Sequence, residues 1–461
     1  MTKLSLHTYQ ENAYNFCLKN RRSYLAIDMG LGKTVIALKV IQTIRQPTLI
    51  VAPLNVIYNT WPSEIKKWGF DLTYTILHGK NKKVDLSKTV NLYLINFEGV
   101  AWLYQEMYKM AKANSPLPFS TLVVDEASRL KSHKTKLFKY LNQLQPVFQN
   151  RFFLSGTPSP QGLSDLWSQY YLLTDGRALN TSFYAFRNKY YEKHPFNPFE
   201  FTLKTGSETE IYEKVKPYTY RLDAKDHLDM PPIIFNYVKV ELPKKLMAQY
   251  MEFYREFLLD IEGITYTAVN AAALSSKLRQ FLQGFLYYDT EELKSNGRPV
   301  RAVTEIHSAK IDALKQLIES VGQPVLVAIQ FKHELEMIRR VYPDAPIIAG
   351  QTNVKDTQMY VEQWNRREIP LLLCHPQSIS HGMNLQAGGN IITYLCTPWS
   401  LEQYQQFNGR LHRQGQKQGV VVNHIIVEKT IDTKVTRKLA EKGMTQQKLL
   451  DFLRDSSTPG K

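Results

Sequence analysis

Cysteine is scarce in this sequence, acidic residues are outnumbered by basic ones, and long apolar runs are missing. The 461 residues include three cysteines, Cys17, Cys374 and Cys396, which are too far apart to form a metal-binding motif. So few cysteines favour a reducing compartment. No run is apolar over the length needed to cross a bilayer, and the first residues lack the apolar core of a secretory signal. We therefore expect no membrane partner and a location in the cytoplasm, or in the nucleus of a eukaryote.

Charge is the clearest compositional bias. Lysine and arginine number 58 against 42 aspartate and glutamate residues, which gives a net charge of +16. This surplus favours a polyanionic partner, most simply nucleic acid, and argues against an acidic carrier role. A generally basic soluble protein is the alternative. Hydrophobic residues make up 43% of the chain, which excludes wholesale disorder, and the length corresponds to roughly two to four domains.

Apolar runs of strand length recur in the first half of the chain and alternate with segments of helical pattern. Continuous apolar strands separated by helices indicate a parallel sheet covered on both faces, so the predicted fold class is α/β. Ligands of such sheets gather at the carboxyl ends of the strands. The predicted strands of this half are residues 24–27, 49–52, 92–95, 122–124 and 152–154.

The first run leads into residues 28–34, Asp-Met-Gly-Leu-Gly-Lys-Thr, and then into a helical pattern. A loop in this position aims backbone N–H groups and a helix N-terminus at one point, where an anion can bind. Lys33 adds an ammonium group for terminal phosphates, and Thr34 adds a hydroxyl suited to Mg²⁺. The usual first glycine of a phosphate loop is replaced by Ile27, and the alternative is a glycine-rich turn. The predicted nucleotide contacts in this loop are Asp28, Met29, Gly30, Leu31, Gly32, Lys33 and Thr34.

Two further strand ends carry residues suited to the same chemistry. Asp125 can hold the hydration shell of Mg²⁺, and Glu126 can polarise an attacking water as a general base. Ser155 begins Ser-Gly-Thr-Pro after the fifth run, a weaker signal because such residues are common in turns. Gln10 lies on a helix predicted over residues 5–20, and its amide can both accept from and donate to an adenine edge. A surface glutamine is the alternative.

The second half repeats the alternation of strands and helices without a second phosphate loop. It therefore predicts a second doubly wound domain that closes over nucleotide held by the first. Arg410 and Arg413 lie three residues apart, on one face of a predicted helix, and their guanidinium groups match phosphate oxygens. The alternatives are surface arginines or contacts to DNA phosphates. The predicted strands of this half are residues 233–242, 325–329, 346–349, 371–374, 391–395 and 420–427.

The middle of the chain sets the domain boundary. Residues 159–230 interleave aromatic and basic residues, which suits base stacking or, as we favour, a helical extension packed on the first domain. Met-Pro-Pro at 230–232 breaks regular structure. We predict an exposed loop over residues 289–299.

The chain is predicted to form two domains and a tail. The first domain is residues 1–228, which include the helical extension. The second is residues 229–445, with a helical insertion at about 244–300, and a fraying tail covers residues 446–461.

In combination, these motifs resemble those of superfamily-two helicases. Gln10, Gly-Leu-Gly-Lys-Thr at 30–34, Asp-Glu-Ala-Ser at 125–128 and Leu-Ser-Gly-Thr-Pro at 154–158 occur in the order of that superfamily. The loop sequence, and Gln-Phe-Asn-Gly-Arg-Leu-His-Arg at 406–413, resemble the Swi/Snf-like ATPases more closely. The resemblance covers roughly residues 5–440, and the lack of added modules resembles compact bacterial or phage-type members.

The resemblance implies two tandem RecA-like domains that hydrolyse ATP, with Mg²⁺, in the cleft between them. It implies a monomeric motor that translocates on double-stranded DNA. The implied catalytic residues are Lys33, Asp125, Glu126, Arg410 and Arg413, with Thr34 and Asp125 at the metal. Further nucleotide contacts are Gln406 and Gly409, and the coupling residues are Ser128, Ser155 and Thr157. The implied nucleic-acid contacts are Pro53, Asn55, Asn96, Gln330, Ser378, Asn384 and Trp399.

The sequence departs from the family pattern at three places, one of which is Ile379-Ser380 in place of a pair of glycines. Ser128 stands where the family usually has histidine. This substitution concerns the coupling of the nucleotide state to the second domain more than it concerns ATP hydrolysis. His375 and Pro376 stand where Ser-Thr is usual, which bears on the nucleic-acid contacts around Ser380 and Gly382.

Three alternatives to the translocase stay open. One is a strand-separating or branch-migrating helicase of replication, recombination or repair. The second is an ATP-gated nucleic-acid-binding module without productive hydrolysis, against which the intact Lys33 and Glu126 argue. The third is an RNA substrate.

Overall fold

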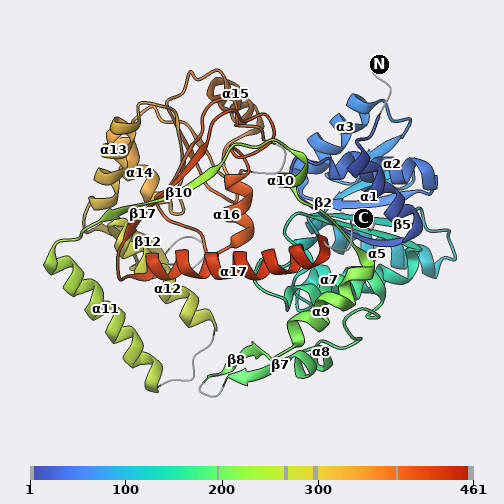
Figure 1. Ribbon diagram of the computed structural model, residues 1–461, viewed down its shortest axis with the longest axis horizontal. Coiled ribbons are helices and arrows are strands. Elements are labelled where there is room, and N and C mark those ends of the chain that lie inside the picture. The colour runs from blue at the N-terminus through green and yellow to red at the C-terminus, as the bar shows by residue number, and fades with distance from the viewer. Residues whose placement is uncertain (1–4, 195–196, 264–267, 294–298, 380–382, 455–461) are drawn as a thin grey trace. The chain divides into compact units, whose positions relative to one another are not determined.

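The computed structural model describes residues 5–454 except 195–196, 264–267, 294–298 and 380–382. The chain divides into two compact units. The first contains residues 1–228 and 442–461, and the second contains residues 229–441. Each unit is built on a parallel sheet with helices on both faces (Figure 1). This confirms the predicted fold class of two tandem doubly wound α/β domains. None of the helices in the described residues is long and apolar enough to cross a membrane.

The sheet of the first unit has the strand order β3-β4-β2-β5-β6-β1-β9, and all neighbouring strands run parallel. Five strands coincide with the predicted apolar runs. The sequence did not predict β3 and β9, which are short and form the two edges of the sheet. The strands are β1 (Arg22–Ile27), β2 (Thr48–Ala52), β3 (Tyr74–Ile76), β4 (Leu92–Asn96), β5 (Thr121–Asp125), β6 (Asn150–Ser155) and β9 (Thr219–Leu222).

Both faces of this sheet are buried, which explains why its strands read as continuous apolar runs. Leu25 and Ile27 of β1 pack with helices α1 to α3, whereas Tyr24 and Ala26 pack with helices α4 to α9 on the opposite face. The helices are α1 (Thr8–Lys19), α2 (Lys33–Ile44), α3 (Trp61–Trp68), α4 (Lys82–Leu86), α5 (Val100–Lys112), α6 (Lys136–Leu144), α7 (Asp165–Thr174), α8 (Phe183–Tyr190), α9 (Ser207–Val215) and α10 (Ala224–His227).

Residues 159–230 pack on the first unit. Trp167, Tyr170, Phe186 and Tyr190 are buried in the same apolar cluster as the sheet, so the packing interpretation of these aromatic side chains is confirmed. The segment is not wholly helical, because it also contains edge strand β9 and an antiparallel hairpin. The strands of this hairpin are β7 (Tyr191–His194) and β8 (Asn197–Leu203).

The second unit has the strand order β10-β17-β16-β13-β15-β14, again all parallel. Val325 and Val327 of β13 pack with helices α12 to α14 and α17, and Leu326 and Ala328 pack on the opposite face with α15 and α16. The strands are β10 (Ile233–Val240), β13 (Val325–Ala328), β14 (Ile347–Ile348), β15 (Leu371–Cys374), β16 (Ile391–Tyr394) and β17 (Val420–Val427). The helices are α11 (Lys244–Gly263), α12 (Ala268–Gln283), α13 (Ala309–Val321), α14 (Lys332–Val341), α15 (Val354–Asn365), α16 (Leu401–Asn408) and α17 (Ile431–Arg454).

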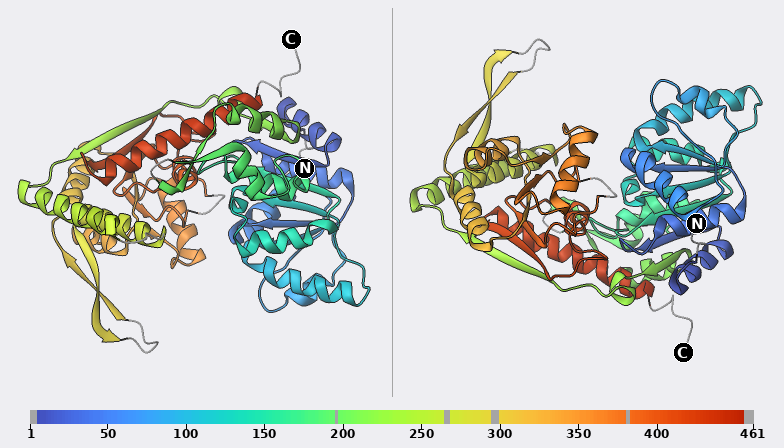
Figure 2. Two further views of the ribbon diagram at one scale, coloured as in Figure 1. Left: turned by 90° about the horizontal axis from the view of Figure 1, so that it is seen from below. Right: turned by 90° about the horizontal axis from the view of Figure 1, so that it is seen from above.

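The loop predicted over residues 289–299 is wrong in its described part. Strands β11 (Phe285–Leu293) and β12 (Pro299–Glu305) pair as an antiparallel hairpin that stands out from its unit (Figure 2). Charged residues in this segment suggested a loop. Apolar and aromatic residues outside it, such as Tyr287 and Val303, are cross-strand partners and hold the hairpin together. Residues 294–298 lie outside the described residues.

The fraying tail predicted from residue 446 is also wrong in its described part. Helix α17 runs to Arg454, and its last turns belong to the first unit. Leu449 and Leu450 are 0% and 3% exposed in the large apolar cluster of that unit. Their burial, rather than the polar composition around them, decides that this segment is helical. Residues 455–461 lie outside the described residues.

Candidate nucleotide site

The loop after β1 has the backbone conformation that its glycines allow. Strand β1 ends at Ile27 and helix α2 begins at Lys33. Gly30 and Gly32 have φ angles of 90° and 82°, a left-handed conformation that favours glycine. A Cβ on Gly32 would lie 2.5 Å from the Gln10 side-chain nitrogen and 2.9 Å from a Val35 methyl carbon, so a larger residue would have to displace these side chains. The loop is therefore closely packed against helix α1.

Gln10 and Lys33 both contact this loop. The Gln10 amide donates to the Leu31 carbonyl at 3.1 Å, and its oxygen accepts from the His7 N–H at 3.0 Å. Lys33 Nζ donates to the Ile27 carbonyl at 2.7 Å. A Cβ on Gly156 would lie 3.3 Å from that carbonyl and 3.8 Å from Lys33 Nζ. The loop, Gln10 and the Ser-Gly-Thr-Pro turn are thus neighbours in the fold.

Asp125 is the last residue of β5 and Glu126 follows it, and β5 is separated from β1 by β6 alone. Asp125 and Glu126 are 7% and 9% exposed. The Trp61 indole N–H donates to Asp125 Oδ2 at 3.1 Å, and the Glu126 backbone N–H donates to Asp125 Oδ1 at 3.1 Å. Glu126 has a φ of 59°, a left-handed conformation that is unusual for glutamate and is found at functional sites.

The predicted coupling residues lie at or just after the ends of β5 and β6: Ser155 is the last residue of β6, and Ser128 and Thr157 lie in the turns that follow the two strands. Ser128 is fully buried in the short helix after Glu126, and its carbonyl accepts from the Lys131 N–H. Ser155 is also fully buried, and its hydroxyl accepts from the Thr157 N–H at 3.0 Å. These contacts shape the turns on either side of β6.

Asp28, the first residue of the loop, is held by a segment about two hundred residues later. Its N–H donates to the Leu222 carbonyl at 3.0 Å. Its carboxylate accepts from the Arg221 guanidinium at 3.0 Å and from the Ala224 N–H at 3.0 Å. Arg221 also forms an ion pair with Asp223. No sequence motif marks Arg221, whose one distinguishing feature is that it lies between two apolar residues, Tyr220 and Leu222.

Three predicted nucleic-acid contacts of the first unit also lie near the carboxyl edge of the sheet. Ala52 and Asn96 are register partners in β2 and β4, so Pro53 and Asn96 end neighbouring strands. Pro53 accepts two backbone N–H groups at the start of a π-helix over Val56–Thr60, and Asn55 is the residue before it. The Asn96 side chain donates to Glu98 at 2.7 Å.

The predicted helix that carries both arginines is wrong. Helix α16 ends at Asn408, and Gly409 caps it by donating to the Gln405 carbonyl at 2.9 Å. Arg410 and Arg413 lie in the turns that follow. Both guanidinium groups nevertheless donate to the carbonyl of Met383, at 3.3 Å and 3.2 Å. Burial lowers the pKa of Arg413. A shared carbonyl, not a helix face, brings the two arginines together.

The other predicted contacts of the second unit are spread more widely. Gln330 and Ser378 follow the neighbouring strands β13 and β15, and the Gln330 amide lies 3.4 Å from a ring nitrogen of His375. Asn384 is exposed, and its carbonyl accepts from Asn365. Trp399 donates to the Ser275 hydroxyl at 3.0 Å and packs on the apolar core. Within α16, the Gln406 amide donates to Glu402 at 3.5 Å. Ser380 and Gly382 lie outside the described residues.

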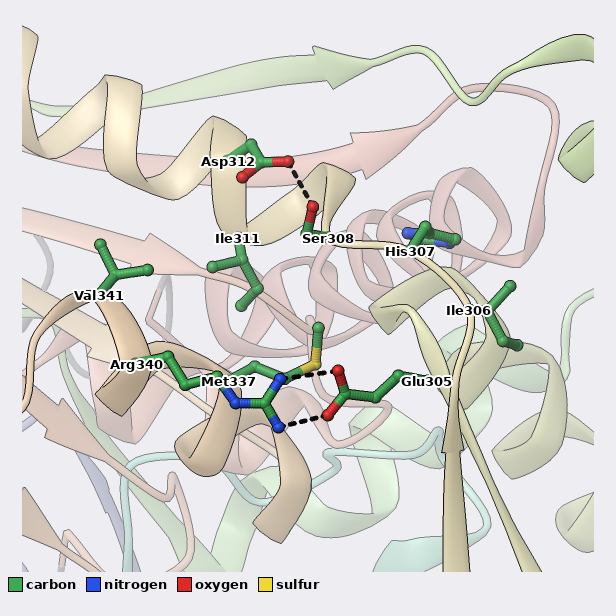
Figure 3. Close-up of a pocket in the computed structure, with 9 residues that line it drawn as sticks. All are labelled: Glu305, Ile306, His307, Ser308, Ile311, Asp312, Met337, Arg340 and Val341. Carbon is green, nitrogen blue, oxygen red and sulfur yellow. Dashed lines mark hydrogen bonds and ion pairs between the residues drawn. The ribbon is translucent and has the colours of Figure 1, made fainter.

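A cavity of about 370 Å³ lies elsewhere in the second unit. Arg340 and Glu305 of its lining form a direct ion pair, in which the guanidinium donates to the carboxylate at 2.7 Å and 2.5 Å (Figure 3). The described residues that line the cavity include none of the predicted site residues. We therefore assign it no part in the nucleotide site.

Comparison with known proteins identifies the family. The SNF2-related domain model matches residues 9–299, and the helicase conserved C-terminal domain model matches residues 309–415. The protein belongs to the SNF2-related family. As a member of this family it is a helicase-like, DNA-dependent ATPase, and the predicted resemblance is confirmed.

Individual SNF2-related relatives cover nearly the whole chain. Protein p41 of Acyrthosiphon pisum secondary endosymbiont phage 1 is 32% identical over 97% of this chain and 98% of its own length. Chromodomain-helicase-DNA-binding protein 1-like of Mus musculus is 24% identical over 96% of this chain, which spans 50% of the mouse protein. The Sulfolobus solfataricus SWI2/SNF2 ATPase core in complex with dsDNA is 21% identical, with a TM-score of 0.44 over 97% of this chain and 94% of that chain.

Proposed function

We propose that this protein is a motor that uses ATP and Mg²⁺ to translocate on double-stranded DNA. The observation that carries the proposal is the convergence of three turns after β1, β5 and β6. These are adjacent parallel strands in the order β5-β6-β1, so their carboxyl ends lie at one edge of the sheet. A lysine, a carboxylate pair and a hydroxyl-rich turn at one edge are what a nucleoside triphosphate and its metal require.

The residues of this edge have distinct proposed roles. Lys33 and the backbone of the loop bind phosphate oxygens, while Thr34 and Asp125 hold Mg²⁺, which neutralises phosphate charge when bound. Glu126 orients the attacking water and accepts its proton. Arg410 and Arg413 of the second unit supply positive charge to the phosphates when the two units close, as arginine fingers do. Loss of that bridge after hydrolysis would let the units separate and step.

Double-stranded DNA is the proposed track. The net charge of +16 suits a phosphate backbone. Pro53, Asn55 and Asn96 lie together near the sheet edge of the first unit, while Gln330 and Ser378 follow neighbouring strands of the second. The name of the mouse relative includes both helicase and DNA-binding.

The test compares ATP hydrolysis with duplex DNA, single-stranded DNA, RNA and no nucleic acid. We expect the largest stimulation with duplex DNA. Glu126→Gln should lower the stimulated rate by about 10²- to 10⁴-fold, because a general base contributes that much. Glu106→Gln, which changes a partly buried glutamate of α5 paired with Lys109, is the matched control and should hydrolyse at the wild-type rate. An unchanged rate in Glu126→Gln would refute the site.

Assays of the wild-type protein separate the remaining candidates. Displacement of a triplex strand without unwinding of a forked duplex would support translocation, and unwinding of the fork would support a strand-separating helicase. Binding of ATP without hydrolysis by the wild-type protein would indicate a nucleotide-gated binding module. Greater stimulation by RNA would replace DNA as the substrate.

A further inference from the structure

A buried arginine lies behind the phosphate loop. Arg221 belongs to β9, which pairs with β1 at the edge of the first sheet, and its register partner is Ala26. The Arg221 side chain is 2% exposed. A buried guanidinium needs partners for its charge and its N–H groups, because desolvation without them is costly. The partners of Arg221 are therefore informative about its role.

Arg221 holds the residues on both sides of Ile27. One guanidinium nitrogen donates to the Ala26 carbonyl at 2.9 Å, and another donates to the Asp28 carboxylate at 3.0 Å. Ile27, between them, offers its carbonyl to Lys33 Nζ at 2.7 Å. Arg221 thus fixes the backbone of residues 26–28, which includes the Ile27 carbonyl that accepts from the Lys33 ammonium group.

A second carboxylate holds Arg221 in turn. Asp223 is 3% exposed and forms an ion pair with the same guanidinium. Burial raises the pKa of the Asp223 carboxyl, Arg221 opposes that rise, and the nearby Asp28 adds to it. Two carboxylates compete for one guanidinium, so a change of Arg221 would leave Asp28 and Asp223 facing each other without a cation between them.

We propose that Arg221 is a positioning residue of the nucleotide site, which sets the place of Lys33 through Ala26, Ile27 and Asp28. The inference rests on the proposed function, because it assumes that Lys33 binds ATP phosphates. A planar guanidinium can reach a carbonyl and a carboxylate at once, whereas an ammonium group on a flexible stem does so poorly. A small displacement of a charged group in such a site has a large effect on binding.

The experiment measures the dissociation constant of a fluorescent ATP analogue with Mg²⁺ and without DNA, together with the melting temperature. Arg221→Met should weaken binding about tenfold or more, and Arg221→Lys by a smaller factor. Duplex DNA affinity should stay within about twofold of wild type. Because Arg221→Met removes a buried charge, Arg221→Lys provides the measurement if the methionine variant does not fold.

Arg151 is the matched control. It lies in β6 of the same unit, its side chain is 3% exposed, and it donates to backbone carbonyls and pairs with Asp175 at 2.6 Å. Arg151→Met should lower the melting temperature without changing ATP affinity. Equal losses of ATP affinity in the Arg151 and Arg221 variants would show a general effect of stability and would overturn the proposal.

A double-mutant cycle tests whether Arg221 affects ATP binding through its contact with Asp28. Asp28→Asn and Arg221→Met together should weaken ATP binding no more than the larger single change, because both act on one contact. Additive losses would overturn an effect through this contact. Failure of the wild-type protein to bind the analogue would refute the proposed function itself, whereas wild-type affinity in a folded Arg221 variant would refute only this inference.

Discussion

At the scale of single residues, the contacts of Asp125 decide how well it can serve a metal. Its two carboxylate oxygens accept from the Trp61 indole and from the Glu126 backbone. Hydrogen bonds from such neighbouring groups fix the orientation of a metal ligand. Trp61 is fully buried and lies 64 residues away in sequence, in the first turn of α3. We infer that this tryptophan serves the proposed Mg²⁺ site as well as the core.

The first prediction concerns this indole. Trp61→Phe keeps an aromatic ring but removes the N–H, and we expect it to raise the Mg²⁺ concentration for half-maximal ATP hydrolysis by about tenfold, as loss of such a contact commonly does. The measurement is a titration of ATPase rate with Mg²⁺ at saturating DNA. Trp167→Phe is the control, since it removes a comparable indole bond, to the Asn180 carbonyl. Identical Mg²⁺ curves for Trp61→Phe and wild type would contradict the assignment.

The motif residues of the proposed site could be predicted from the sequence, whereas the residues that hold them in position could not. Residues 28–34 and Asp125-Glu126 are recognisable because each motif consists of consecutive residues and follows an apolar strand. Arg221 and Trp61 act through contacts to residues 193 and 64 positions away, which no local pattern reveals. The helix predicted for Arg410 and Arg413 failed because Gly409 ends α16 one residue earlier.

At the scale of elements, burial explains which segments were predictable. Strands buried on both faces, such as β2 and β5, are continuous apolar runs and were found. Strand β9 is buried but has a threonine and an arginine among its four residues, and β3 has only three residues, so neither is a continuous apolar run that the sequence reveals. The sequence does not show the two hairpins either, because their stability comes from cross-strand pairs. The end of α17 was missed because two leucines among polar residues do not show where they will be buried.

The second prediction concerns those leucines. Leu449→Ala should lower the free energy of unfolding of the first unit by about 2–5 kcal/mol, because it leaves a cavity in a packed core. Met444→Ala, in the same helix, changes a side chain that is 60% exposed and should have an effect within about 0.5 kcal/mol. Urea denaturation followed by tryptophan fluorescence measures both. Similar losses in the two variants would show that the end of α17 is not packed on the core.

At the scale of the whole molecule, charge should govern the encounter with DNA. The surplus of 16 positive charges is a property of the complete chain rather than of one motif. Each phosphate that a lysine or arginine neutralises releases counterions, so affinity falls as salt concentration rises. This contribution does not depend on the DNA sequence.

The third prediction follows from this. The logarithm of the association constant for duplex DNA should fall linearly with the logarithm of salt concentration, with a slope of about −0.9 per phosphate neutralised. Asn55→Ala removes an uncharged proposed contact, so it should weaken binding by about two- to tenfold while leaving the slope unchanged. Fluorescence anisotropy over a salt series measures both. A slope near zero would argue against a phosphate track.

The two-unit organisation also belongs to this scale. The alternation of strands and helices predicted two similar domains, because each half repeats one pattern. It did not predict that the chain returns to its first unit, since that depends on where Leu449 and Leu450 are buried.

That return has a consequence for biosynthesis. A ribosome releases residues 1–228 first, then the whole of residues 229–441, and only afterwards the leucines that fill the first core. The first unit therefore finishes folding after the second has been made, not before it. A message that stops short of codon 449 would yield a chain with most motor motifs but an apolar gap in its first unit, open to aggregation or proteolysis. Only chains translated past Leu450 can complete the unit that carries the phosphate loop.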